Sequence, residues 1–113
     1  KIGYFTKNIS TNKFQALKNI KELKLTVLGT QHNIFAELPN TKLSLQGNFS
    51  NELLTIDDKN DFKSSLDEYL NLCLEHSPTH RSGWIASLDH GVQKITPEAN
   101  IHLFIDQIRT KLA

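Results

Sequence analysis

The amino-acid sequence predicts an all-α fold, a compact bundle of about five helices. Two stretches with helical periodicity support this prediction, one beginning near Asp61 and one that opens at residues 95–98. The ambiguous middle third favours short helices, because two isolated strands would form only a marginal sheet. The alternative is an α+β fold with short strands near residues 23–28 and 42–46.

Residues 10–28 are predicted as the first helix. Ser10 or Thr11 can cap it, and Gly29 is a natural stop. Apolar residues recur at three- and four-residue spacing, namely Ala16, Leu17, Ile20, Leu23, Val27 and Leu28. The stretch 23–27 also alternates apolar and polar residues, so a strand fits its pattern equally well. Length favours the helix.

The middle third predicts short elements. Residues 32–38 suit a short helix that ends before Pro39, because the residue before a proline is pushed out of helical geometry. Residues 41–46 fit either a strand or one helical turn stopped by Gly47. Residues 50–52 precede apolar positions and suit a capped helical turn.

The stretch from Asp61 to about His76 predicts a helix with one apolar face. The stripe comprises Phe62, Leu66, Tyr69, Leu70 and Cys73. Asp57, Asp58 and Asp61 offer amino-terminal caps, and the helix should end before Pro78. A further segment from about Thr79 to His90 carries Trp84, Ile85 and Leu88.

The closing helix has the clearest start. Thr96 can cap the free amide groups, Pro97 is pre-set for the first helical position, and Glu98 lies at the positive end of the helix dipole. Its apolar residues are Ile101, Leu103, Phe104, Ile105, Ile108 and Leu112.

Bulk properties indicate one helical domain over residues 1–113. The chain begins with Lys1 and not with Met, so we expect a fragment of a longer protein. A net charge of +1 argues against nucleic acid as a partner, and no apolar run is long enough for a transmembrane helix. Cys73 is the single cysteine and cannot form an intrachain disulfide, which fits a reducing, cytoplasmic-type compartment.

One spacing is typical of metal ligands. Cys73, His76, His80 and His90 would have to act together, because a structural zinc site needs four ligands at close quarters. Cys73 as a small core residue and the histidines as polar groups near helix ends explain the pattern without a metal. We therefore expect no cofactor and no metal.

Two short segments suggest contacts with a protein partner. Arg81 and Trp84 are of the residue types that most often anchor protein interfaces. Trp84 also suits a core position in which its indole nitrogen reaches a carbonyl. Asp89 and His90 adjoin Gly91 and could act as orienter and base, although a surface loop explains them as well. We predict that Arg81, Trp84, Asp89 and His90 bind a partner.

Basic residues form one face of the predicted first helix. They are Lys13, Lys18, Lys21 and Lys24. Such a face is usually only solvated, and contact with an acidic membrane surface is the functional alternative.

The chain resembles a recurrent helical region of Legionella type IV (Dot/Icm) secreted effectors. The resemblance rests on residues 3–7 and 13–17, the Leu-rich stretch stopped at Gly47, and Tyr69-Leu70 followed by a turn containing Trp84 and a closing helix. It implies an accessory or carboxy-terminal module of a secreted bacterial effector, located in the bacterial cytoplasm or, once secreted, in the host cell. It assigns no catalytic residue.

These observations predict a non-enzymatic protein-interaction module, because no catalytic set is assembled in the sequence. The alternative from another class is a small enzyme or a metal-dependent domain that uses Cys73, His76, His80 and His90. Burial discriminates between the two, since a packed Cys73 with divergent histidines excludes a shared site.

Overall fold

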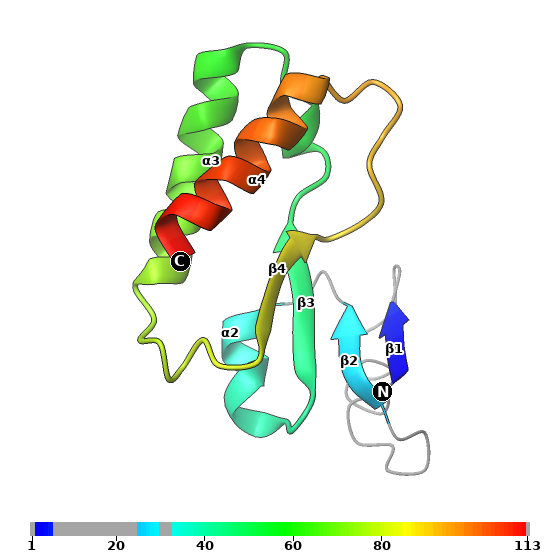
Figure 1. The fold of residues 1–113 in the computed structure, drawn as a ribbon, viewed down its shortest axis with the longest axis vertical. Helices are drawn as coiled ribbons and strands as arrows, with labels where there is room; N and C mark the ends of the chain where they lie inside the picture. The colour runs from blue at the N-terminus through cyan, green and yellow to red at the C-terminus, as the bar shows by residue number, and fades with distance from the viewer. Residues whose placement is uncertain (1, 6–24, 30–32, 113) are drawn as a thin grey trace.

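The computed structural model describes residues 2–5, 25–29 and 33–112, which form a mixed α and β fold (Figure 1). The strands are β1 (Ile2–Phe5), β2 (Leu25–Gly29), β3 (Ser44–Phe49) and β4 (Trp84–Leu88). The helices are α2 (Ile34–Glu37), α3 (Lys59–Leu74) and α4 (Glu98–Leu112), with 3-10 turns η1 (Leu38–Asn40) and η2 (Leu53–Thr55). The strands form one sheet in the order β1-β2-β3-β4, and every neighbouring pair is parallel.

The predicted all-α bundle of about five helices is therefore wrong. The prediction treated the middle strands as isolated, whereas β3 is paired on both sides, with β2 and with β4. A paired strand can bury one face, and β3 does so, with Leu45, Gly47 and Phe49 buried and the residues between them half-buried. Burial on alternate residues is the period-two pattern of a strand.

The α+β alternative comes closer, because its strands near residues 23–28 and 42–46 overlap β2 and β3. The predicted helix over residues 10–28 is wrong at its end, where Leu25–Gly29 is a strand. Its preceding part lies outside the described residues. No strand is predicted from the sequence at β4, whose half-buried and exposed residues lack strict alternation.

Short elements of the middle third lie close to the predicted positions. The helix predicted at 32–38 corresponds to α2. Asn33 caps this helix, because its side chain accepts a hydrogen bond from the Ala36 N–H. The 3-10 turn η1, which contains Pro39, follows directly. The turn predicted after residues 50–52 is η2. The segment 41–46, for which one helical turn was the alternative to a strand, contributes the first half of β3.

The helix predicted from Asp61 is confirmed as α3. Asp58 caps it, because its Oδ1 accepts hydrogen bonds from the N–H groups of Asn60 and Asp61, both at 2.9 Å. The predicted stripe packs inward: Phe62, Leu66, Leu70 and Cys73 are buried, and Tyr69 is half-buried.

The closing helix is confirmed as α4, but its expected cap is wrong. The Thr96 hydroxyl is buried and has no hydrogen-bond partner among the described residues. Asn100, in the first turns of α4, is buried and donates through Nδ2 to the carbonyls of Leu54, at 2.9 Å, and Ile56, at 2.8 Å. The side chain of Asn100 therefore fastens α4 to the loop around η2.

Two apolar clusters lie at opposite ends of the β3–β4 pair. The larger cluster, toward the carboxyl ends, contains Phe49, Leu54, Phe62, Leu66, Leu70 and Phe104. The Phe49 ring contacts the rings of Phe62 and Phe104, with centroids 6.3 and 5.2 Å apart, so one strand residue joins α3 and α4. The smaller cluster, near the amino ends, contains Ile34, Leu38 and Leu45.

None of the helices described by the structure combines the length and the apolar character needed to cross a membrane.

Candidate functional site

The carboxyl ends of β3 and β4 lie side by side (Figure 1). Phe49 and Leu88, the last residues of the two strands, are direct partners in the parallel ladder. The loops that leave the strands therefore start next to each other. In parallel α/β sheets, ligands bind outside the carboxyl ends of the strands, which makes this edge the candidate functional site.

The turn after β4 is held by three hydrogen bonds. The Asp89 N–H donates to the Phe49 carbonyl at 2.8 Å and extends the ladder by one residue. Asp89 Oδ1 accepts from the Asn51 N–H at 2.8 Å, and Asn51 Nδ2 donates to the Gly91 carbonyl at 2.9 Å. Asn51 thus contacts both neighbours of His90.

His90 is half-buried at the centre of this turn. An imidazole can donate a hydrogen bond to an anionic group or exchange a proton with a substrate. Asp89 and His90, predicted as a pair able to act as orienter and base, therefore lie at the sheet edge where ligands are expected. The carboxylate of Asp89 accepts from the backbone of Asn51 and stabilises the turn.

Further polar side chains line β3 and β4 below this edge. Gln46 Nε2 donates to Ser87 Oγ at 3.2 Å. Asn48 is fixed by α3, because the Tyr69 hydroxyl donates to Asn48 Oδ1 at 3.1 Å and accepts from the Asn48 N–H at 3.3 Å. Burial raises the pKa of Tyr69, so its hydroxyl stays protonated and acts as a hydrogen-bond donor.

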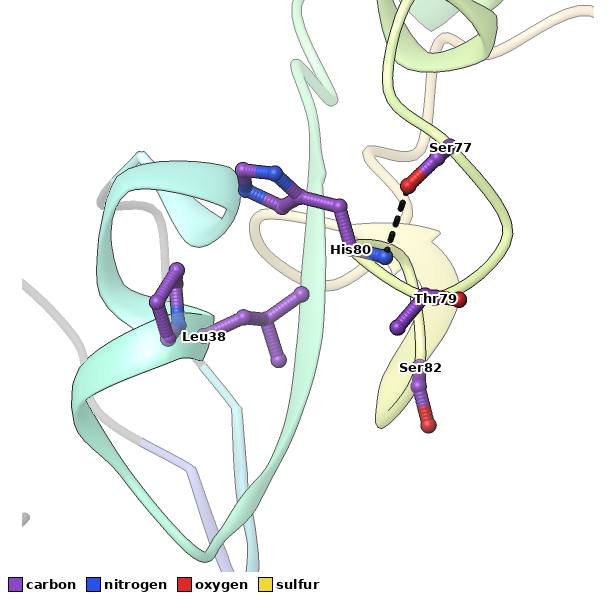
Figure 2. Close-up of a pocket in the computed structure, with 6 residues that line it drawn as sticks. Leu38, Ser77, Thr79, His80 and Ser82 are labelled. Carbon is purple, nitrogen blue, oxygen red and sulfur yellow. Dashed lines mark hydrogen bonds between the residues drawn. The ribbon is translucent and has the colours of Figure 1, made fainter.

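A hollow of about 360 Å³ lies at the opposite end of β4, where the chain enters the strand (Figure 2). Its lining residues are Leu38, Pro39, Ser77, Thr79, His80 and Ser82. The His80 N–H donates to Ser77 Oγ at 3.2 Å, and His80 Nε2 lies 2.8 Å from the Phe35 carbonyl. A carbonyl only accepts, so this nitrogen carries a proton and the ring serves to fasten the loop to α2.

The four predicted metal ligands do not converge. Cys73 is buried in α3, where desolvation raises the pKa of its thiol. The His76 and His80 rings are near each other, with centroids 4.6 Å apart, but His90 follows the far end of β4. Within the described residues, no three His, Cys, Asp or Glu side chains are placed to hold one metal ion. A shared site of Cys73, His76, His80 and His90 is therefore not formed.

The predicted partner-binding residues are divided between the two ends of β4. Trp84 begins the strand, packs edge-on against Phe35 at 5.0 Å and donates through Nε1 to the Gly47 carbonyl at 2.8 Å. Its indole nitrogen thus reaches a carbonyl, as the core interpretation predicts. Arg81 lies before β4, whereas Asp89 and His90 follow it. A partner contact at these residues stays a prediction.

The basic face formed by Lys13, Lys18, Lys21 and Lys24 lies outside the described residues, so contact with an acidic membrane surface also stays a prediction.

Four residues of the candidate site carry roles that the sequence does not predict, namely Gln46, Asn48, Asn51 and Tyr69. A signal for two of them is present in the sequence. If residues 44–49 are taken as a strand, Asn48 stands at its carboxyl end and Asn51 in the loop that follows. Tyr69 was assigned only to the apolar stripe of α3, and its hydroxyl contact depends on how the helix packs against β3.

Comparison with known proteins identifies one family. The family model described as uroporphyrinogen decarboxylase (URO-D) matches residues 2–111. No curated protein and no solved structure matches the chain. The resemblance to a helical region of Legionella effectors is therefore wrong, since it rested on a capped helix, an aromatic turn and a glycine stop that many small domains share. The predicted non-enzymatic interaction module of a bacterial effector is also wrong, and the alternative of an enzyme fits better.

Proposed function

Because the chain belongs to the uroporphyrinogen decarboxylase (URO-D) family, we propose that it is an enzyme domain that decarboxylates uroporphyrinogen or a similar substrate. The match over residues 2–111 is the observation that carries this proposal. The parallel sheet supports it, because such sheets bind substrates at the carboxyl ends of their strands.

Decarboxylation sets two chemical requirements. The bond between the substrate carbon and its carboxylate breaks, CO₂ leaves with the two oxygens, and the carbon takes up a proton in exchange. The site must therefore hold an anionic substrate and supply a proton. A protonated imidazole meets both requirements near neutral pH.

We assign this role to His90. It follows β4 directly, its two neighbours are hydrogen-bonded to Asn51, and it is half-buried at the carboxyl edge of the sheet. As imidazolium, His90 would pair with a substrate carboxylate and provide the proton that replaces it. Gln46 would supply a neutral hydrogen bond from the adjoining strand.

Release of labelled CO₂ from carboxyl-labelled uroporphyrinogen tests the proposal. His90→Gln should lower kcat/KM by about 100-fold or more, as expected when a general acid is removed. The matched control is His102→Gln on α4, whose side chain is 69% exposed and lies next to Glu98, and it should retain the parent rate. A His90→Gln protein that decarboxylates at the parent rate would remove His90 from the site, and absence of CO₂ release from the parent would overturn the assigned reaction.

The free thiol of Cys73 also supports a reducing compartment as the place where the enzyme works. The thiol is buried on the inward face of α3.

A further inference from the structure

Asn51 connects the loop after β3 to the turn that carries His90 by two hydrogen bonds. It lies two residues after the end of β3 and reaches across to the loop after β4. One of its contacts uses its backbone N–H, which donates to Asp89 Oδ1 at 2.8 Å. The other uses its side chain, whose Nδ2 donates to the Gly91 carbonyl at 2.9 Å. Residues 89 and 91 flank His90, so both sides of the histidine are fastened to one residue.

Gly91, at the exit of this turn, is exposed, and a Cβ added to it would meet no atom of the described residues within 4 Å. The contacts that the structure shows on the backbone of residues 89 and 91 are hydrogen bonds. The ladder bond from the Asp89 N–H to the Phe49 carbonyl fixes the entrance to the turn, and the Asn51 amide fixes its exit.

We propose that Asn51 is a positioning residue that holds His90 at the carboxyl edge of the sheet in its reactive orientation, an inference that rests on the role assigned to His90 above. The carboxylate of Asp89 takes part by receiving the Asn51 N–H. A group that acts on a bound substrate loses much of its effect when it is displaced by about 1 Å, so a loosened turn should slow the reaction while the substrate still binds.

Four variants separate the two contacts. Asn51→Ala removes the bond to Gly91 but keeps the backbone bond to Asp89, and Asn51→Asp replaces the donor by an acceptor that faces the Gly91 carbonyl. Asp89→Ala removes the acceptor, whereas Asp89→Asn keeps an oxygen in the same place and should keep residues 89–91 ordered. Asn71→Ala, at an exposed position of α3, is the matched control for loss of an asparagine side chain.

The first readout needs no substrate. Backbone ¹⁵N relaxation should show that order parameters at residues 89–91 fall from about 0.85 toward 0.6 in Asn51→Ala, Asn51→Asp and Asp89→Ala. Asp89→Asn and Asn71→Ala should match the parent at these residues, and α3 and α4 should keep their order in every variant. Unchanged order at residues 89–91 in Asn51→Ala would overturn the positioning role.

The second readout is kinetic. Asn51→Ala should lower kcat for CO₂ release by about 10- to 100-fold with a much smaller change in KM. In a His90→Gln background the same substitution should have little further effect, because its only route to the reaction is through His90. An equal loss in both backgrounds would overturn the inference, since Asn51 would then act by another route.

The two readouts also distinguish this inference from the proposed function. If the order of the turn is lost in Asn51→Ala but His90→Gln leaves CO₂ release unchanged, the function assigned to His90 fails, although Asn51 does hold residues 89–91 in place. If His90→Gln abolishes activity but Asn51→Ala neither loosens the turn nor lowers kcat, the function stands and the inference fails.

Discussion

The Tyr69 hydroxyl and Asn48 form a reciprocal pair of hydrogen bonds that joins α3 to β3. The hydroxyl donates to Asn48 Oδ1 at 3.1 Å and accepts from the Asn48 N–H at 3.3 Å. The ring of Tyr69 packs edge-on against Phe49, with centroids 5.0 Å apart. One side chain therefore contributes both apolar packing to the larger cluster and a polar contact to the strand that leads to the candidate site.

Tyr69→Phe should lower the free energy of unfolding by about 1 to 3 kcal/mol, because it keeps the ring but leaves the half-buried Asn48 without the hydroxyl. Urea unfolding of parent and variant measures the difference. Leu72→Ala is the control, since Leu72 is 54% exposed on the same helix and its truncation should cost less than about 0.5 kcal/mol. A Tyr69→Phe protein as stable as the parent would show that the hydroxyl contributes nothing net.

The raised pKa of Tyr69 predicts a loss of stability at alkaline pH. Burial is the main cause, so the folded protein holds the phenol proton more tightly than the unfolded chain does. The free energy of unfolding is independent of this group below about pH 10, the ordinary pKa of tyrosine, and it falls as the pH rises further because only the unfolded chain ionises readily.

Urea midpoints measured at a series of pH values above about 9 test this sign. The parent should lose stability more steeply with rising pH than Tyr69→Phe does. The buried Cys73 thiol, whose pKa burial also raises, is hydrogen-bonded to the Tyr69 hydroxyl, so both proteins are compared in a Cys73→Ala background and their difference then reports on Tyr69. Parallel pH profiles would contradict the prediction.

The stability of the fold is predicted to depend on the amide group of Asn100 and not only on the shape of its side chain. Its Nδ2 donates to the carbonyls of Leu54 and Ile56, and its side chain is 4% exposed. Asn100→Asp places a carboxylate oxygen where the amino group stood, so two carbonyls lose their donor and a charge is buried. The variant should be destabilised by about 3 kcal/mol or more at neutral pH, and by less when acid protonates the new carboxyl.

Thermal melts at neutral and acidic pH measure this difference. Asp106→Asn, at an exposed position of the same helix, is the control for a change of charge on α4. A larger loss for Asn100→Asp in acid than at neutral pH would show that burial of charge is not the cause.

Leu66 is predicted to be essential to the packing of α3 in the larger cluster. It is fully buried. Leu66→Ala should lower the free energy of unfolding by about 2 to 5 kcal/mol, through lost burial and a residual cavity. Denaturant melts provide the measurement, again with Leu72→Ala as the exposed control, and a difference below about 0.5 kcal/mol would mean that Leu66 does not pack as described.

Local sequence signals are sufficient to predict the two long helices, α3 and α4. Asp58 and the spacing of Phe62, Leu66 and Leu70 define α3 without reference to the rest of the chain. The cap of α4 was predicted less well, because Thr96 has the right side chain but its hydroxyl is buried without a partner among the described residues. The contact of Asn100 with the η2 region depends on tertiary packing, which the pattern around residue 96 does not contain.

The parallel sheet could not be predicted in the same way, because its pairing joins strands far apart in the chain. The partners Phe49 and Leu88 are separated by the whole of α3. A segment such as Trp84–Leu88, half-buried through much of its length, has no clear period of its own. The position of His90 follows from that pairing. The sequence therefore indicates Asp89 and His90 as candidate residues, but it does not predict that they lie at the edge of a sheet.

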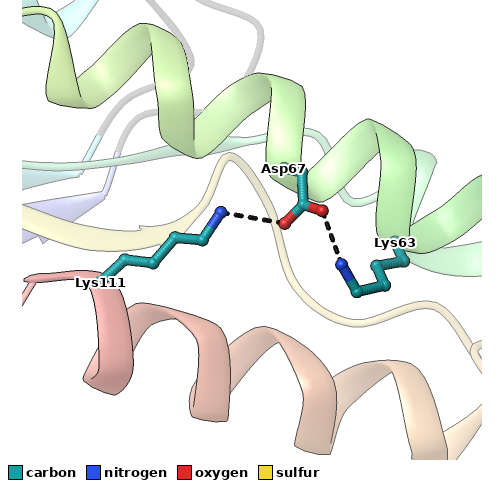
Figure 3. A network of polar contacts seen from close by, with 3 residues as sticks. All are labelled: Lys63, Asp67 and Lys111. Carbon is teal, nitrogen blue, oxygen red and sulfur yellow. Dashed lines mark hydrogen bonds and ion pairs between the residues drawn. The ribbon is translucent and has the colours of Figure 1, made fainter.

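Asp67 of α3 pairs with two lysines, one on its own helix and one on α4 (Figure 3). Lys63 Nζ lies 2.8 Å from Asp67 Oδ2, one helical turn away, and Lys111 Nζ of α4 lies 3.0 Å from Oδ1. The hydrogen bond from Lys63, followed by that from Lys111, lowers the pKa of Asp67. The folded protein therefore favours the carboxylate, so its stabilising contribution is present above the ordinary aspartate pKa of about 3.9 and is lost as the pH falls through the lower folded value.

Asp67→Asn should reduce the free energy of unfolding at neutral pH by no more than about 1 kcal/mol, because both ion pairs are partly exposed to water. The difference from the parent should shrink in about 0.5 M salt and disappear once acid has protonated Asp67 in the folded protein. Lys111→Met should cost more than Lys63→Met, since the Lys111 side chain is 26% exposed and that of Lys63 is 52% exposed, and only Lys111 joins two helices. Urea melts across acidic and neutral pH measure all three variants. If the stability difference between Asp67→Asn and the parent grew in acid, its pH dependence would have the opposite sign to the one predicted. The ion pairs would then be excluded as its source.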